Sequence, residues 1–354
     1  MKKLFSLLLT VAIAFSLAGC SSKKNFDSEI YIFLPGEYIS DDMIASFEEQ
    51  YNIRVNKDLF DSNESMYTKL LGGSTYDILI PSDYMIEKLI AEDMLQKIDT
   101  SALENYDGLD AALMNSEYDP NNEYSVPYFW GNVGIVYDHT KIDQADVESQ
   151  GWSVLANPKY KGLLYMYDSE RDSFMIALKS LGYSVNTTNK AELDAAYQWL
   201  AALDAATDPA YVTDDAIDGL ANCTDGKYMG VMYSGDAAYI LSENANMRYW
   251  APTEGTNYWV DAMVIHKDAK NVEGALKFID FVISYDSQVE NSSYVGYSAV
   301  NKEALDTIAK GEYADNDAYT PREQTAKDEV FHACPDDIRA YMSDLWIKVK
   351  SSTN

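Results

Sequence analysis

Histidine and cysteine are scarce in this chain, with three residues of each among 354. The histidines, His139, His266 and His332, are scattered and have none of the spacings typical of metal ligands. The nucleophile motif Gly-x-Ser-x-Gly, the zinc motif His-Glu-x-x-His and a phosphate-binding loop are also missing. We therefore expect no metal site, no cofactor and no enzyme of these motif-bearing classes.

Basic residues are few as well, with 27 lysines and arginines against 57 aspartates and glutamates and a formal net charge of −30. This negative charge argues against nucleic acid and against direct binding to anionic lipid, because both partners would be repelled. Small cations would be attracted. Solubility alone explains the acidity equally well, so the charge permits a cationic ligand without requiring one.

A long apolar run lies within the first twenty residues, MKKLFSLLLTVAIAFSLAGC. Two lysines, an apolar stretch and small residues before a cysteine are typical of a secretory signal rather than of a membrane-spanning helix. The last four residues resemble a bacterial lipobox, which implies a signal peptide over 1–19, a lipid on Cys20 and a tether over 20–27. We expect a lipid-anchored protein on the outer face of the cell membrane; an ordinary cleaved signal is the alternative.

Two further cysteines, Cys223 and Cys334, would lie in an oxidising compartment after export. They could form one disulfide bridge, but the sequence does not show whether they are close in space. A bridge and two free thiols both stay open.

Strands are predicted to alternate with helices along the chain, whose length suggests two domains of roughly 100–200 residues each. The predicted strands are 29–35, 53–60, 76–83 and 131–138, the predicted helices are 43–52, 63–72, 84–95 and 190–206, and the segments 161–183 and 228–241 each combine a strand with a helix. This alternation is typical of parallel sheets with helices on their faces, so the expected fold class is α/β with two lobes. No Pro-rich or Ser-rich linker separates the lobes, so the chain should cross between them along strands that act as a hinge.

One carboxylate lies where burying its charge would be energetically unfavourable. Asp261 lies within the apolar run NYWVDAMVI, and no Lys or Arg lies within five residues of it. In parallel sheets, ligands gather beyond the carboxyl ends of the strands, which singles out residues 35–38 and 82–84 as crevice lining. A ligand, a distant lysine or backbone amide groups could each compensate the charge of Asp261.

Seven segments in order carry a family resemblance: SNESMYTKL, YDILIPSDYMIEKLIAEDMLQKID, YDPNNEYSVPYFWG, KSLGYSVNTTN, YWVDAMVI, GALKFIDF and VGYSAVN. Together they closely resemble the substrate-binding protein of spermidine/putrescine ABC transporters. The resemblance implies a monomeric, two-lobed type II solute-binding fold that closes on a polyamine and delivers it to a membrane permease. The expected lobes are 28–135 plus 262–303 and 136–261 plus 304–354.

The resemblance also implies binding residues. Six positions match the family without substitution: Tyr38, Ser82, Tyr84, Trp259, Asp261 and Tyr297. Asp172 stands where the family usually has glutamate, although it could instead cap the helix that follows. Pro35, Ser169 and Tyr233 replace an aromatic residue, an acidic residue and a tryptophan of the family. Asp83, Asp168 and Asp236 lie beside matched positions and could supply the missing carboxylate.

These residue types suit a polyamine on physical grounds. Its ammonium groups require carboxylates, its charges and methylenes favour aromatic faces, and both kinds of residue are predicted here. The departures leave the choice between putrescine and spermidine open. The alternatives are the same fold with another solute, such as thiamine, an amino acid derivative or a complexed metal, and a secreted glycosidase with two carboxylates.

Overall fold

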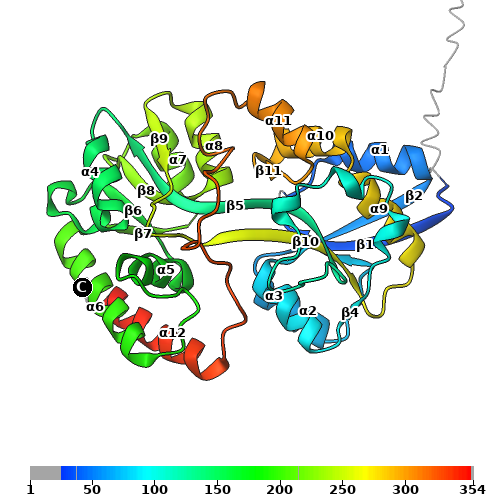
Figure 1. The fold of residues 1–354 in the computed structure, drawn as a ribbon, viewed down its shortest axis with the longest axis horizontal. Helices are drawn as coiled ribbons and strands as arrows, with labels where there is room; N and C mark the ends of the chain where they lie inside the picture. The colour runs from blue at the N-terminus through cyan, green and yellow to red at the C-terminus, as the bar shows by residue number, and fades with distance from the viewer. Residues whose placement is uncertain (1–24, 37, 214, 352–354) are drawn as a thin grey trace, which may run out of the picture.

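The computed structural model describes residues 25–36, 38–213 and 215–351. The expected signal peptide over 1–19 and Cys20 lie outside the described residues. Figure 1 shows two lobes, with two long strands running from one to the other. Within the described ranges, no helix combines the length and apolarity that crossing a membrane requires.

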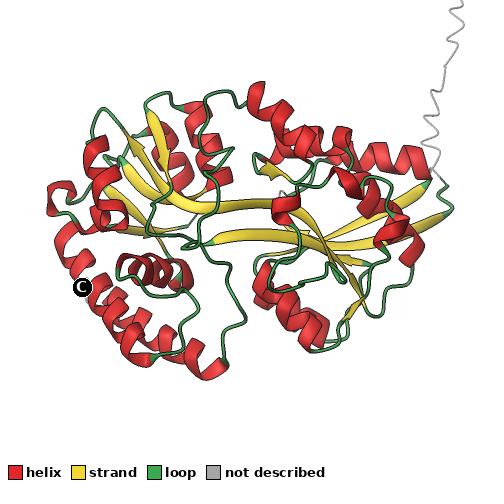
Figure 2. Cartoon of the chain, in the orientation of Figure 1, coloured by secondary structure: helices red, strands yellow, loops and turns green. Residues whose placement is uncertain are grey.

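The first lobe is an α/β layer structure in which helices flank the sheet (Figure 2). Its strands are β1 (Ser28–Pro35), β2 (Ile53–Phe60), β3 (Ile78–Leu79), β4 (Leu95–Gln96) and β11 (Ser298–Ala299). Its helices are α1 (Asp41–Tyr51), α2 (Asn63–Leu71), α3 (Asp83–Ala91), α9 (Val272–Val282) and α10 (Tyr285–Val295), with α11 (Lys302–Lys310) packed on α10. Strand β1 pairs in parallel with both β2 and β3. The carboxyl ends of these strands therefore face the second lobe together.

The second lobe repeats this plan. Its strands are β6 (Leu164–Tyr167), β7 (Ala210–Val212), β8 (Met229–Tyr233) and β9 (Met247–Trp250). Its helices are α4 (Gln144–Gln150), α5 (Glu170–Ser180), α6 (Lys190–Thr207), α7 (Asp215–Asn222), α8 (Ser234–Glu243) and α12 (Asp336–Ser351). Strand β6 pairs in parallel with β7 and with β8, so helices α5 and α8 begin at the edge that faces the first lobe.

Two strands, β5 (Ser125–Asp138) and β10 (Tyr258–His266), join the lobes. All 14 residues of β5 are buried. Residues 125–132 of β5 pair with β10, whereas residues 133–137 pair with β8 of the second lobe. The change of partner lies between Asn132 and Val133. The prediction that the chain crosses between the lobes along strands is confirmed.

The predicted α/β class is confirmed, with one difference in topology. Instead of two separate sheets, the strands form a single path in the order β2-β1-β3-β10-β5-β8-β6-β7. Both β5 and β10 run antiparallel to their neighbours on this path. The reason is that one strand carries the chain out of the first lobe and the other brings it back.

Local sequence explains the elements that hold the site. In β1, the side chains of Ile30, Ile32 and Leu34 are fully buried on one face and Phe33 on the other, each burial contributing about 1.5–3 kcal/mol. Helix α1 begins directly after Ser40, whose hydroxyl accepts hydrogen bonds from two amides of the first turn. Strand and helix together fix the connection between them, which carries Tyr38.

The segment between α11 and α12 has little regular structure and passes between the lobes, drawn in orange to red in Figure 1. The Lys179 ammonium group of α5 forms an ion pair with Glu329 of this segment and also donates to the Lys327 carbonyl. The Glu329 carboxylate accepts further hydrogen bonds from the Ser184 hydroxyl and the Val185 amide. These contacts fix the segment to the second lobe.

Candidate ligand-binding site

Asp261 lies beside a β-bulge between the crossing strands. It is paired with Phe129 of β5, whereas the next residue, Ala262, is paired with Pro127, so Tyr128 is the extra residue. A bulge of this kind turns neighbouring side chains away from the regular alternation of the sheet. Asp261 is the one residue of β10 that keeps partial exposure, and every other residue of that strand is buried.

The carboxylate of Asp261 is held by two hydroxyl groups. The Tyr38 hydroxyl donates a hydrogen bond to Oδ2 of Asp261 at 2.5 Å. This bond and the Ser82 hydroxyl both lower the pKa of the carboxylate. Burial outweighs them, so the pKa of Asp261 lies above the usual value. No basic side chain contributes to its environment, and the charge that the sequence left unexplained is only partly compensated within the described chain.

Tyr38 is itself positioned by Tyr128. The Tyr128 hydroxyl donates to the Tyr38 carbonyl at 2.5 Å and accepts from the Asn291 side chain at 2.9 Å. Tyr38 is 7% exposed, and burial together with the negative charge of Asp261 raises the pKa of its hydroxyl. It therefore stays protonated and remains a hydrogen-bond donor.

A second carboxylate, Asp83, stands at the first position of α3, directly after Ser82. Its Oδ1 accepts the Tyr84 amide at 2.7 Å, whereas its Oδ2 is buried without a hydrogen-bond partner. Burial raises the pKa of Asp83 to about 8, and the negative charge of Asp261 adds to the rise. The charge of Asp261 therefore acts on Asp83, which lies at the start of the helix that follows Ser82.

A third carboxylate, Asp172, comes from the other lobe. Ser169 caps helix α5 and accepts the Asp172 amide, so Asp172 is not the capping residue. Oδ2 of Asp172 accepts the hydroxyls of Ser169 at 2.6 Å and Tyr233 at 3.0 Å. Its Oδ1 is buried without a partner, and burial raises its pKa.

Aromatic rings join these carboxylates. Tyr297 contacts Tyr38 edge-on at 5.7 Å between ring centroids, and it contacts Trp259 in the same manner at 5.2 Å. Trp259 in turn meets Tyr233 at 6.4 Å, with their planes at 88°. These four rings form an aromatic wall that runs from the first lobe across the hinge. Tyr233, at the far end of the wall, donates the hydrogen bond to Asp172. Tyr297 also donates a hydrogen bond to Asp236 at 3.4 Å.

Glycine at two positions allows this wall to close. A Cβ atom at Gly235 would lie 2.0 Å from the Tyr297 ring, and one at Gly131 would lie 2.6 Å from the Trp259 ring. Both separations are far shorter than any real contact, so a side chain at either position would displace an aromatic residue of the wall.

Tyr84 lies at another edge of the cluster. Its hydroxyl donates to Glu64 at 3.1 Å, and the Arg171 guanidinium lies over its ring at 4.9 Å. Arg171 also lies over the ring of Phe331, at 4.1 Å. A cation of the chain itself therefore stands beside the carboxylates.

Two further candidates from the sequence have partners other than the cluster residues described above. Asp168 is paired with Lys350 of α12 and is exposed. Pro35 ends β1, where it is paired with Phe60.

Cys223 and Cys334 are both free, which settles the question of a disulfide between them.

Sequence reasoning missed Tyr118, which is 6% exposed. Burial and the charges of Asp83 and Asp261 raise the pKa of its hydroxyl, so the charges of both carboxylates act on it. Tyr118 begins one of the segments that carried the family resemblance, YDPNNEYSVPYFWG, so that segment was the available signal.

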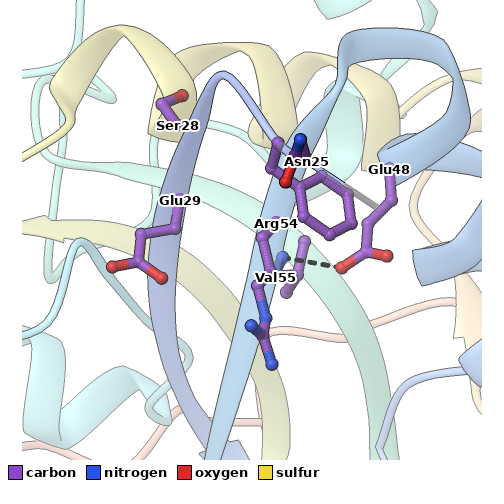
Figure 3. A pocket seen from close by; sticks show the side chains of 7 residues that line it. Asn25, Ser28, Glu29, Glu48, Arg54 and Val55 are labelled. Carbon is purple, nitrogen blue, oxygen red and sulfur yellow. Dashed lines mark hydrogen bonds between the residues drawn. The ribbon is translucent and has the colours of Figure 1, made fainter. Parts of the chain in front are cut away.

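Two hollows lie elsewhere. One of about 850 Å³ lies at the beginning of β1 and β2, and its lining includes Glu29, Glu48 and Arg54 (Figure 3). It is separated from Tyr38 by the length of β1, roughly 25 Å. Another of about 180 Å³ lies behind Arg171, between residues 185–188 and 332–335. In the described part of the chain, no three side chains of metal-ligating type are grouped closely enough to hold a metal ion.

Comparison with known proteins gives the same fold. Residues 42–321 match the family described as bacterial extracellular solute-binding protein. The spermidine/putrescine-binding periplasmic protein of Salmonella typhimurium is 33% identical over 350 residues, covering 98% of this chain and 97% of that protein.

Two solved structures are similar over most of the chain. A putative spermidine/putrescine ABC transporter protein from Listeria monocytogenes has a TM-score of 0.80 and 36% identity, covering 92% of this chain and 99% of that one. The substrate-binding protein PotD of Streptococcus pneumoniae has a TM-score of 0.81 and 35% identity, covering 92% and 100%. The expected type II periplasmic-binding fold is confirmed, and the chain belongs to the bacterial extracellular solute-binding protein family.

Proposed function

We propose that this chain is the extracellular receptor of an ABC importer and that it binds a polyamine, putrescine or spermidine, for delivery to a membrane permease. The names of the Salmonella, Listeria and Streptococcus relatives, all of which refer to spermidine and putrescine, support this proposal. The site gives it an independent physical basis.

The observation that carries the proposal is a group of buried carboxylates with unsatisfied oxygens. Oδ2 of Asp83 and Oδ1 of Asp172 have no hydrogen-bond partner, and the pKa values of Asp83, Asp172 and Asp261 are all raised by burial. Ionised carboxylates in such positions require positive charge nearby. A molecule with separated ammonium groups supplies both the charge and the missing donors.

The aromatic wall favours the same ligand. Cation–π contacts contribute about 0.5–2 kcal/mol each, and every methylene removed from water adds about 0.8 kcal/mol. An aromatic wall beside carboxylates therefore suits a flexible methylene chain with charged ends. A neutral sugar would supply no positive charge to these carboxylates.

The proposed contacts follow from the geometry. Asp261 binds one ammonium group with the support of Tyr38 and Ser82, and Asp172 binds another with the support of Ser169 and Tyr233. The side chains proposed to line the methylene chain are Tyr84, Trp259 and Tyr297. Asp83 and Asp236 complete the negative surroundings, whereas Asp168 and Pro35 are not included.

We also propose that the lobes close on the ligand by bending of β5 and β10, with the boundaries expected from the sequence moved in two places: β10 enters the first lobe before Asp261, and α11 stays whole in that lobe. The change of strand partners at Asn132 and Val133 supports a hinge there. Asp261 and Asp172 belong to opposite sides of this point, so a ligand that bridges them stabilises the closed form by differential contact.

Isothermal titration with putrescine, cadaverine, spermidine and spermine tests the proposal. We expect a Kd in the micromolar range or below for at least one of the four. Thiamine and 4-aminobutyrate serve as cationic and zwitterionic controls. Binding of either control without binding of any polyamine, or binding of none of the six compounds, would overturn the proposed function.

We further propose that Cys20 carries the lipid anchor of a monomeric receptor. The lipobox-like residues 17–20 support this. Labelling with a radioactive fatty acid in the native host should mark the wild type and not Cys20→Ser, and equal labelling of both would contradict the anchor. Size-exclusion chromatography with light scattering, applied to a chain that starts at residue 25, should give one chain per particle.

A further inference from the structure

We propose that Arg171 is an internal cation that closes one end of the binding site and makes it selective for ligands with two positive charges over ligands with three. This inference rests on the proposed polyamine function. It names a residue that would decide between putrescine and spermidine.

The position of Arg171 is fixed from both lobes. Its guanidinium lies over the Tyr84 ring of the first lobe at 4.9 Å and over the Phe331 ring of the C-terminal segment at 4.1 Å. It also donates a hydrogen bond to the His332 carbonyl. A planar cation stacked on two rings and tied to a carbonyl is held in place, so its charge stays at this edge of the site.

The guanidinium adds positive potential to the carboxylates without taking up their free oxygens. Its charge acts to lower the pKa of Asp83 from the first lobe and of Asp172 from the second. Yet Oδ2 of Asp83 and Oδ1 of Asp172 have no hydrogen-bond partner. Arg171 therefore offsets part of their negative charge and leaves them able to bind an ammonium group of the ligand.

The arrangement limits the number of charges that the ligand can carry. A diamine can place one ammonium group at Asp261 and the other at Asp172. A longer triamine that enters beside Tyr84 would bring its third ammonium group toward the guanidinium. The ammonium group and the guanidinium would repel each other, and the repulsion is strong where water is excluded.

Titration of Arg171→Met with putrescine and spermidine tests the inference, because methionine keeps the apolar length of the side chain and removes the charge. We expect the wild type to bind putrescine more tightly. In Arg171→Met, the ratio of the spermidine Kd to the putrescine Kd should fall by about tenfold or more. Arg171→Lys is the matched control, since it keeps the charge and should keep most of the wild-type preference. Thermal unfolding of both variants establishes that they are folded.

A singly acetylated spermidine separates charge from length, because it has the length of the triamine with only two positive charges. If Arg171 acts by its charge, the wild type should bind acetylspermidine more tightly than spermidine, and Arg171→Met should lose this difference. An unchanged spermidine-to-putrescine ratio in Arg171→Met, or a wild type that prefers spermidine, would overturn the inference while leaving polyamine binding intact. Failure of the wild type to bind any polyamine would instead remove the proposed function itself.

Discussion

A carboxylate removed from water stays ionised only where positive charge or hydrogen-bond donors replace its hydration. Asp83, Asp172 and Asp261 illustrate how incomplete that replacement is here. Backbone amides and the hydroxyls of neighbouring residues lower their pKa values, but burial prevails at all three. The ligand-free site is therefore destabilised by its own charges, and a bound cation relieves this cost.

Asp261→Asn should weaken polyamine binding by about 10- to 100-fold. The substitution keeps the shape and the contact with Tyr38 but removes a charge-assisted hydrogen bond, which contributes roughly 1.5–3 kcal/mol. Isothermal titration measures the effect. Asp268→Asn, which neutralises an exposed aspartate just after the same strand, should leave the affinity unchanged. An unaltered Kd in Asp261→Asn would show that this carboxylate does not bind the ligand.

Asp83 should make the stability of the ligand-free protein fall as the pH rises from about 4 to about 8. Its pKa is 3.8 in the ordinary state and about 8 when buried, so the folded chain retains a proton that the unfolded chain releases across this window. The stability that this proton contributes is fully present below pH 3.8, and it is lost as the pH rises past about 8. The slope cannot exceed about 1.4 kcal/mol per pH unit for one proton.

Thermal unfolding of the wild type and Asp83→Asn between pH 5 and pH 8.5 measures this dependence. The wild type should lose stability relative to the variant as the pH rises, because asparagine does not ionise. Putrescine should reduce the difference, since it supplies the missing positive charge. Parallel profiles for the two proteins would contradict the assigned role of Asp83.

Sequence reasoning identified individual site residues where a charge or an aromatic stood out in its local context, as Asp261 does in an apolar strand. It had no means of weighing Arg171, which stands among acidic residues in DSERDSF and reads as a solvated surface cation. Only the fold places Tyr84 and Phe331, distant along the chain, beside its guanidinium.

Among the helices and strands, those with strong local signals were predicted closely. The strand predicted at 53–60 is β2 with the same bounds, and the helix predicted at 190–206 is α6, Lys190–Thr207. The strand predicted at 76–83 shortens to Ile78–Leu79, because the following turn carries the capping residue Ser82 of α3. The strand predicted at 131–138 ends at Asp138 as expected, but β5 begins six residues earlier, at Ser125, where it pairs with β10 of the first lobe.

Gly235→Ala should weaken polyamine binding by about tenfold and lower the thermal stability. Gly235 lies in the first turn of α8, and a Cβ there would lie 2.0 Å from the Tyr297 ring, which is rigid and packed against Trp259. Overpacking of this kind typically costs 1–3 kcal/mol. Titration and thermal unfolding measure the two effects. Gly72→Ala is the control, because Gly72 is exposed at the end of α2 and its added Cβ would come no closer than 3.2 Å to another heavy atom; equal behaviour of the two variants would contradict the packing argument.

Contacts between the lobes bear on the proposed closure of the whole molecule. The His332 ring lies between Glu87 of α3, at 3.3 Å from Nδ1, and Glu117, at 3.1 Å from Nε2. The Ala333 amide also donates to Glu87 at 2.7 Å. Glu87 therefore joins the first lobe to the segment that Lys179 and Glu329 fix to the second.

Glu87→Ala should weaken polyamine affinity several-fold although Glu87 is not a proposed ligand contact, because it removes two contacts that join α3 of the first lobe to the segment held by the second. Isothermal titration gives the affinity, and small-angle X-ray scattering gives the radius of gyration with and without ligand. Glu273→Ala removes a carboxylate that is paired with Lys277 within α9, and it should change neither quantity. Matching affinities for the two variants would show that the Glu87 contacts do not support closure.

The sequence by itself determined the α/β class, the chain's passage between lobes along strands and the bounds of a few elements such as β2 and α6, because these follow from local periodicity, capping residues and short-range connections. The tertiary structure alone decided which carboxylates share one environment. Asp83, Asp172 and Asp261 lie on three separate elements, and their raised pKa values arise from burial among residues far apart in the chain. Burial and charge–charge interactions depend on distance in space, which local sequence does not encode.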